Sequence, residues 1–431
     1  MKDYENHDHL VIERAKGIHL YGPGGKVYYD TISSWWTNLH GHGHRDIRRG
    51  VNRQMKTLDH VNFSGFTHGP AVELAQRLRD HLPSGLSRFF YSDNGSTAVE
   101  VALKMAFQYF KNQGNDARDT FLYFDNSYHG DTLGAMSVSG QGPFGKPFES
   151  LKFSAIQAPK PCAKCSSGTP GTGDTCLGEC FKATAELLEN HQDRLAAVII
   201  EPLVQCVGGM WIHSTAFLRA LVEKARSLNI MVIFDEVATG FGRTGTMFAL
   251  DQAKVQPDFL CLSKGITGGV LPLAVTVTTN QVYEAFYDDY GKYKTFFHGH
   301  SYTANPVACA AGIASLEIFR KEKTLERVAR TSSFFAQTLK NTFQGSYVGA
   351  LRNLGMIGAL DLVPEKGKSF PAKDRVGYQV YRRSLENGLV LRPLGDTLYW
   401  LLPLVVREKD IKIILERSRM TIEEVLRGRN L

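Results

Sequence analysis

The chain has 431 residues, of which 43 % are hydrophobic and 22 % are charged, and its formal net charge is +7. This length is too great for one small binding module, and the composition is that of a globular protein rather than a disordered or fibrous one. The positive charge is spread thinly along the sequence, which favours a solvated surface over binding to nucleic acid or a membrane.

Neither the N-terminus nor the apolar segments carry a targeting or membrane signal. The start, MKDYENHDH, lacks a basic stretch followed by an apolar one, so we expect no secretory signal. The longest apolar run, residues 398–406, is far shorter than the roughly 18 to 20 residues that span a bilayer, and Pro403 interrupts it. The protein is therefore expected to be soluble and cytoplasmic.

Short apolar runs alternate with helical patterns through the middle of the chain. Strands are predicted at five of these runs, 89–93, 121–125, 196–202, 231–237 and 258–264. Several have apolar side chains at consecutive positions, as strands buried on both faces of a parallel sheet do. Residues 96–110 and 215–228 have the three- and four-residue apolar spacing of helices. The alternation predicts an α/β fold with a doubly wound, mainly parallel sheet.

The two ends of the chain have a different pattern. Residues 17–34 predict a pair of short strands around a Gly-rich turn, and roughly the last 80 residues mix strands with helices. We expect both ends to form a smaller α+β domain beside the large sheet. The predicted parts are residues 1–55 and 306–431 for the smaller domain, the latter beginning with a linker helix, and residues 56–305 for the large one. A Pro-, Gly- and Ser-rich loop insertion is predicted at 159–181.

Ligands of open parallel sheets bind beyond the carboxyl ends of the strands, so the residues that follow each strand are the strongest candidates for a site. Gly95 and Ser96 open a helix whose free amides suit a phosphate, although an ordinary helix cap is an alternative interpretation. Tyr128, after the next strand, has the flat ring that stacks on a heterocycle, or it is a turn aromatic.

Two charged residues also follow buried strands. Asp235 projects from a strand end and requires a cationic partner there. Lys264 follows a strand in a glycine-flanked turn and has no acidic residue beside it in the sequence. Most lysines are solvated and unreactive, so a lysine in this position is unusual. Pyridoxal phosphate requires a lysine that bonds to its aldehyde, a carboxylate at its pyridine nitrogen, a helix N-terminus for its phosphate and an aromatic ring against its own. Together with Gly95, Ser96 and Tyr128, these residues predict that cofactor.

The order and spacing of four segments, IIEP, FDEVATGFGRTG, SKGITGG and HGHSYTANP, resemble the class III, fold type I, pyridoxal-phosphate aminotransferases. Other segments, ISSWWTNLHGHGH and LRPLGDTLYWLLP among them, resemble the branch of this family that acts in biotin biosynthesis, in which the pair Trp35 and Trp36 is a mark. The resemblance runs from about residue 10 to the C-terminus. It implies conversion of 8-amino-7-oxononanoate to 7,8-diaminononanoate.

The resemblance also assigns roles to residues. It implies that Lys264 binds the cofactor covalently and that Asp235 pairs with the pyridine nitrogen, with Tyr128 as the third catalytic residue. Gly95 and Ser96 would hold the phosphate, helped by His300 and Ser301 of the neighbouring subunit of a homodimer. The implied substrate pocket consists of Trp35, Tyr128, Gly299, Arg392 and Tyr399. Arg392 suits the terminal carboxylate of the substrate; a surface ion pair for Arg392 and a core position for Trp35 are the alternatives.

The sequence departs from the family pattern at its start and at residues 298–302. The family usually has a segment ahead of this start, with a His-Pro pair and often a Tyr or Cys that reaches the substrate, and this chain is expected to lack it. Members that use S-adenosylmethionine read His-Gly-Pro-Thr-Phe where this chain has residues 298–302, HGHSY, which resembles the variant of members that use lysine. Either compound therefore remains a candidate amino donor.

Four of the seven cysteines lie in the predicted insertion, a third departure from the family. The residues are Cys162, Cys165, Cys176 and Cys180. Their spacing allows a tetrahedral thiolate site for a structural zinc ion, and free thiols are the alternative.

Two other functions compete with the biotin-pathway reaction. One is a different ω-aminotransferase of the family, acting on ornithine, 4-aminobutyrate or a β-amino acid. The other is a catalytically dead metal-binding or interaction module, which would require the loss of Lys264 or Asp235, and both are present.

Overall fold

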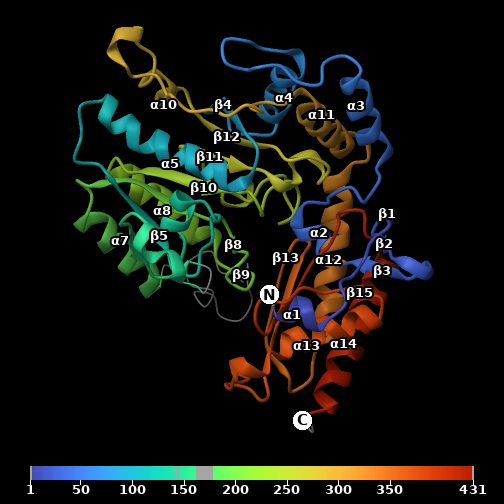
Figure 1. Ribbon diagram of the computed structural model, residues 1–431. Coiled ribbons are helices and arrows are strands. Elements are labelled where there is room, and N and C mark those ends of the chain that lie inside the picture. Colours follow the sequence, from blue (N-terminus) through green and yellow to red (C-terminus); the bar gives the residue numbers. More distant parts are fainter. Residues whose placement is uncertain (1, 141, 143–144, 162–177, 430–431) are drawn as a thin grey trace.

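The computed structural model describes residues 2–140, 142, 145–161 and 178–429. A seven-stranded sheet forms the centre of the larger part of the molecule (Figure 1). Its strands, in spatial order, are β4 (Leu86–Ser92), β12 (Ala274–Thr279), β11 (Phe259–Leu262), β10 (Met231–Asp235), β7 (Leu195–Ile200), β5 (Thr120–Phe124) and β6 (Ile156–Ala158). Only β12 runs antiparallel to its neighbours, so the prediction of a mainly parallel sheet is confirmed.

The central strands are short, fully buried and mostly apolar. All residues of β5, β7, β10 and β11 are buried, as the consecutive apolar positions predicted. Helices cover the sheet: α4 (Gly69–Arg79), α5 (Gly95–Asn112), α6 (Leu133–Ser137), α7 (Glu179–Asn190), α8 (Thr215–Ser227), α9 (Leu250–Ala253) and α10 (Asn280–Glu284). The two predicted helices, 96–110 and 215–228, correspond to α5 and α8, whose starts are capped by Asn94 and Ser214.

The two ends of the chain meet in the smaller part of the molecule (Figure 1). A four-stranded sheet joins β1 (Arg14–Lys16), β2 (His19–Tyr21) and β3 (Val27–Asp30) to β15 (Leu389–Val390). A three-stranded sheet consists of β13 (Val348–Leu354), β14 (Ile357–Leu362) and β16 (Thr397–Leu401), and β8 (Val204–Gln205) pairs with β9 (Trp211–Ile212). The boundaries predicted at residues 55 and 305 stay a prediction.

The remaining helices are α1 (Lys2–Asn6), α2 (Ser33–Trp36), α3 (Arg45–Met55), α11 (Pro306–Lys321), α12 (Thr324–Thr342), α13 (Val376–Glu386) and α14 (Glu408–Arg427). Within the described residues, none of the helices is long and apolar enough to cross a membrane. One detail of the predicted insertion at 159–181 is wrong, because α7 begins at Glu179. Its apolar residues Cys180 and Leu188 are buried, and this burial stabilises a helix that composition alone did not indicate.

The environment of the buried residue His40 predicts that the protein loses folding stability as the pH falls. Its Nε2 lies 2.9 Å from Ser315 Oγ of α11, and burial lowers the pKa of His40 from 6.5 to about 3. The unfolded chain therefore takes up a proton below pH 6.5 that the folded chain does not, so stability is lost as the pH falls. The loss from this residue is about 2 kcal/mol at pH 5.

We expect His40→Gln to remove this part of the acid sensitivity. The urea midpoint of the wild type should fall more steeply between pH 7 and pH 5 than that of His40→Gln. The matched control is His7→Gln, at an exposed histidine just after α1, and its urea midpoint should depend on pH as that of the wild type does. Parallel pH profiles for the wild type and His40→Gln would contradict the assignment.

Candidate active site

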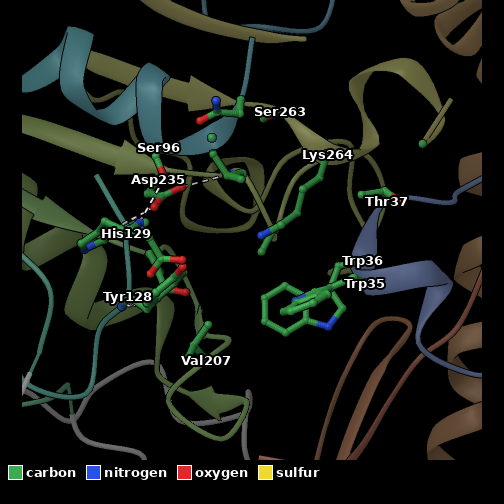
Figure 2. A pocket seen from close by; sticks show the side chains of 18 of the residues that line it. Trp35, Trp36, Thr37, Ser96, Tyr128, His129, Val207, Asp235, Ser263 and Lys264 are labelled. Carbon is green, nitrogen blue, oxygen red and sulfur yellow. Dashed lines mark hydrogen bonds and ion pairs between the residues drawn. The ribbon is translucent and has the colours of Figure 1, made fainter. Parts of the chain in front are cut away.

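A cavity of about 820 Å³ lies at the carboxyl ends of β10 and β11, where the large sheet faces α2 and the loop before β16. This volume is within the range of cofactor and small-molecule sites, which is about 300 to 1,000 Å³. Eight of the residues that the sequence singled out line it: Trp35, Gly95, Ser96, Tyr128, Asp235, Lys264, Arg392 and Tyr399. Figure 2 shows the Lys264 side chain reaching into the space between Asp235 and the two tryptophans.

Asp235 is the last residue of β10, and its carboxylate is buried beneath the cavity. One oxygen, Oδ2, lies 2.7 Å from His129 Nδ1, and the other accepts a hydrogen bond from the Val237 amide at 3.1 Å. The opposite ring nitrogen of His129 is buried and has no hydrogen-bond partner among the described residues. The histidine fixes the orientation of the carboxylate, and a buried carboxylate is stable only with such partners.

Lys264 follows β11 and begins a tight turn with a positive φ of 45°. Its Nζ lies 4.6 Å from the centre of the Trp36 ring. Burial lowers the pKa of Lys264, which increases the fraction of neutral amine available to react or to accept a proton. The turn packs closely on the smaller part of the molecule, since a Cβ on Gly269 would lie 2.8 Å from the Thr37 carbonyl carbon.

The N-terminus of α5 faces the same cavity. Asn94 caps the helix by accepting a hydrogen bond from the Thr97 amide at 3.1 Å. The preceding amides, those of Gly95 and Ser96, have no acceptor within the described part of the chain and line the cavity with the positive end of the helix dipole. Gly130 packs against this terminus so closely that a Cβ there would lie 2.0 Å from Ser96 Oγ. The geometry therefore suits an anionic group such as a phosphate.

The opposite wall is built on an unusual backbone. All four residues of α2, Ser33–Trp36, have positive φ values, of 50°, 46°, 67° and 74°. Such a left-handed turn costs roughly 1–2 kcal/mol per residue for amino acids other than glycine. Arg243, which is buried, holds it from one side by donating to Ser33 Oγ at 3.1 Å, to the Trp36 carbonyl at 3.1 Å and to the Leu402 carbonyl at 2.8 Å.

This turn directs two aromatic rings toward the cavity. The side chain of Trp35 is 54 % exposed, and the Arg392 guanidinium carbon lies 3.7 Å from the centre of its ring. Trp36 is buried, and its Nε1 donates a hydrogen bond to the Tyr399 hydroxyl at 3.1 Å. Trp35 is thus not a core aromatic, and Arg392 stacks on a ring. The alternative of a core position is therefore wrong for Trp35, and Arg392 forms no ion pair with any described residue.

Glu201 is a cavity residue that the sequence analysis did not assign to the site. Its carboxyl group is buried, accepts hydrogen bonds from the amides of Tyr128 at 3.1 Å and Cys206 at 2.8 Å, and burial raises its pKa to about 7. The reasoning that identified Asp235 applies to it as well, because Glu201 directly follows the buried strand β7. His129 carried no comparable signal, since only its position beside Tyr128 marked it.

Three predicted residues lie away from this cavity within one chain. Gly299, His300 and Ser301 are absent from its described lining. The His300 amide donates to Thr303 Oγ1 at 3.2 Å, and His300 Nε2 is buried without a hydrogen-bond partner among the described residues. The prediction placed His300 and Ser301 in the site of a neighbouring subunit, and it stays a prediction.

Only one of the four predicted zinc ligands lies within the described residues. Cys162, Cys165 and Cys176 lie outside the described residues. Cys180 is buried at the start of α7. In the part of the chain that the structure describes, no group of three or more His, Cys, Asp or Glu residues is arranged to hold a metal ion.

Comparison with known proteins identifies the family. The family model "Aminotransferase class-III" matches residues 1–422. The chain belongs to the class III aminotransferases. This confirms the resemblance seen in the sequence. Family members use pyridoxal phosphate, and a buried carboxylate, a lysine whose pKa is lowered by burial and a helix N-terminus around one cavity fit that cofactor.

Relatives and solved structures match over nearly the whole chain. The "adenosylmethionine-8-amino-7-oxononanoate aminotransferase" of Aquifex aeolicus is 39 % identical over 99 % of this chain and 94 % of its own length. That of Synechococcus elongatus is 43 % identical over 97 % of this chain and 96 % of its own. The crystal structure of the Methanocaldococcus jannaschii protein of the same name, 35 % identical, has a TM-score of 0.93 and covers 98 % of this chain and 95 % of its own. An (S)-enantioselective omega-transaminase from Thermomicrobium roseum, 29 % identical, has a TM-score of 0.92 with coverages of 99 % and 94 %.

Proposed function

We propose that this class III aminotransferase transfers an amino group to 8-amino-7-oxononanoate, giving 7,8-diaminononanoate for biotin synthesis, with S-adenosylmethionine or lysine as the amino donor. The observation that carries the proposal is the identity of 34 % to 43 % that the chain shares, over nearly its full length, with relatives named for this substrate. The site supports it, because one wall of the cavity combines tryptophan rings with a guanidinium.

Different residues around the cavity would bind the cofactor and the substrate. Pyridoxal phosphate, when bound, withdraws electrons from the substrate carbon that loses or gains a proton. Asp235 would hold the pyridine nitrogen, while Gly95 and Ser96 would hold the phosphate. Lys264 would bind the cofactor covalently and then, once displaced by substrate, move a proton as the general base. Its lowered pKa suits that task.

The aromatic wall would receive the acceptor substrate. Arg392 can hold a terminal carboxylate by two parallel hydrogen bonds, and the rings of Trp35 and Tyr128 provide an apolar surface for an aliphatic chain. Burial raises the pKa of Tyr128, so its hydroxyl stays protonated and can donate a hydrogen bond to substrate.

Steady-state assays with 8-amino-7-oxononanoate as acceptor would test the proposal and identify the donor. We expect turnover with S-adenosylmethionine or with lysine. No turnover with either compound would refute the proposed substrate. The second candidate function, another ω-aminotransferase activity, is favoured by structural neighbours described as omega-transaminases. Turnover of ornithine, 4-aminobutyrate or a β-amino acid in place of 8-amino-7-oxononanoate would support it.

We also propose a homodimer in which His300 and Ser301 help to bind the partner's cofactor phosphate. His300 and Ser301 lie in the segment 287–302, which carries five exposed aromatic residues. They are Tyr287, Tyr290, Tyr293, Phe297 and Tyr302, each between 61 % and 72 % exposed. Exposed apolar surface of this kind marks interfaces. Side chains of α5 hold the segment in place: Lys104 Nζ lies 3.0 Å from His298 Nδ1, and Gln108 Nε2 donates to the Lys294 carbonyl at 3.0 Å.

Phe297→Asp is expected to convert the dimer to monomers, because burial of a charged group in an apolar interface is unfavourable. Sedimentation velocity would show the change in mass, and dialysis followed by absorbance would show weaker retention of pyridoxal phosphate. Phe148→Asp, at an exposed aromatic residue outside that segment, is the control and should remain dimeric. A Phe297→Asp protein that is still dimeric and retains its cofactor would argue against the proposed interface.

A structural zinc ion bound by Cys162, Cys165, Cys176 and Cys180 remains a separate proposal, supported by their spacing. It would stabilise the insertion and take no part in amino transfer. Elemental analysis giving well under one zinc or iron per chain, with four titratable thiols, would refute it.

A further inference from the structure

The left-handed turn Ser33–Trp36 is held on a second side by a residue outside the cavity. Asp30 ends β3 and is only 1 % exposed. Its Oδ1 accepts a hydrogen bond from the Ser34 amide at 2.8 Å, and its Oδ2 accepts one from Ser34 Oγ at 2.7 Å. His42 Nε2 lies 2.9 Å from the same Oδ2. Both carboxylate oxygens are therefore occupied by the turn and by the histidine behind it.

These contacts are placed where the backbone most requires support. Ser34 has a φ of 46°, and a carboxylate that binds both its amide and its hydroxyl fixes the residue in that conformation. The directions of the next two side chains follow from the backbone. If the turn relaxed to right-handed φ values, the Trp35 ring would leave Arg392, whose guanidinium now stacks on it. The Trp36 ring would leave Lys264, whose side chain points toward the two tryptophans in Figure 2.

We propose that Asp30, backed by His42, is a positioning residue for the acceptor substrate: it holds the turn that keeps Trp35 and Trp36 in the wall of the cavity. Neither Asp30 nor His42 is among the described residues that line the cavity, so both act through the turn. Arg243 supports the same turn by donating to hydroxyl and carbonyl oxygens, whereas Asp30 supports it by accepting with both carboxylate oxygens.

The kinetic test rests on the proposed function, because it uses 8-amino-7-oxononanoate. Asp30→Asn retains an acceptor for the Ser34 amide but replaces the oxygen that accepts from Ser34 Oγ. We expect its KM for this substrate to rise about tenfold or more while kcat falls less, because the turn holds the wall that binds substrate, whereas Lys264, which moves the proton, is placed by the end of β11. Asp30→Ala should show a larger rise. A fall in kcat with unchanged KM would overturn the proposal.

A double-mutant cycle separates positioning from general destabilisation. If Asp30 acts through Trp35, the effect of Asp30→Asn on KM should shrink to within about twofold when Trp35 is already alanine. Full additivity of the two substitutions would count against the proposal. Asp410→Asn is the matched control: Asp410 is also a buried carboxylate, paired with Arg407 at 2.8 Å, and it contacts neither the turn nor the cavity. Its KM should equal that of the wild type.

Hydrogen exchange gives a readout that does not depend on the substrate. The Trp36 amide donates to the Ile32 carbonyl at 2.8 Å and the Thr37 amide to the Ser33 carbonyl at 3.0 Å, both within the turn. In Asp30→Asn, the peptide covering residues 31–38 should exchange about tenfold faster, while the α14 peptide should be unchanged. Unchanged exchange at 31–38 would overturn the inference. Failure of the wild type to aminate 8-amino-7-oxononanoate would refute the proposed function alone.

Discussion

Lys264→Ala is expected to lower kcat by about 10⁴-fold or more, since it removes both the covalent anchor of the cofactor and the group that moves the substrate proton. The absorbance band of the wild-type holoenzyme, expected at roughly 410 to 430 nm, should disappear with the amine. Single-turnover kinetics and an absorbance spectrum of the same preparation would measure both effects. Burial and a lowered pKa make Lys264 the candidate for this role.

Two comparisons identify the cause of that loss. Lys182→Ala, at an exposed lysine of α7, should leave the spectrum and kcat at wild-type values. Added methylamine should restore part of the activity of Lys264→Ala, because a small amine can enter the cavity and carry the proton. Near-normal turnover or a retained absorbance band in Lys264→Ala would show that another residue binds the cofactor.

Asp235→Ala is expected to lower kcat by about 10³-fold with the fold intact, which is the effect of removing one charged group aimed at a developing charge. The loss follows because the carboxylate would no longer stabilise the protonated pyridine nitrogen. Urea unfolding would establish that the fold survives, and the rate would be measured at saturating cofactor. Turnover near the wild-type value would refute the role.

His129 gives a graded control for the same site. It touches Asp235 at 2.7 Å and acts through it, so His129→Ala should cost about 10- to 100-fold, less than Asp235→Ala. The double variant should be little worse than Asp235→Ala alone, because the histidine has no effect without the carboxylate. An effect of His129→Ala that equals or exceeds that of Asp235→Ala would reverse the order of importance.

The residues that follow buried strands were predictable from the sequence for a geometrical reason. Parallel strands end at one edge of a sheet, so Asp235 and Lys264 meet although 29 positions separate them along the chain. The same rule would have added Glu201 to the site. It did not indicate that β12 runs antiparallel between β4 and β11, because a short apolar run carries no information about its direction.

The turn Ser33–Trp36 was not predictable, because its causes lie far away in the sequence. Nothing in the residues Ser, Ser, Trp and Trp favours positive φ. Arg243 reaches Ser33 across 210 positions, and the Ser33 hydroxyl donates to the Leu401 carbonyl across 368. The tertiary structure therefore overrides the local preference, and only the family resemblance, which placed Trp35 in the substrate pocket, marked the segment.

The meeting of both chain ends has a consequence for biosynthesis on the ribosome. The large sheet uses strands between residues 86 and 279, so its partners have all been translated long before the chain is released. By contrast, β3 can pair with β15, and the Ser33 hydroxyl can donate to the Leu401 carbonyl, only after nearly the whole chain has been translated. Domains fold as units while synthesis proceeds, and distant contacts form late. The tryptophan wall is thus assembled last, and a nascent chain that stops short of residue 401 has the strand-end half of the cavity without the half that would receive the acceptor.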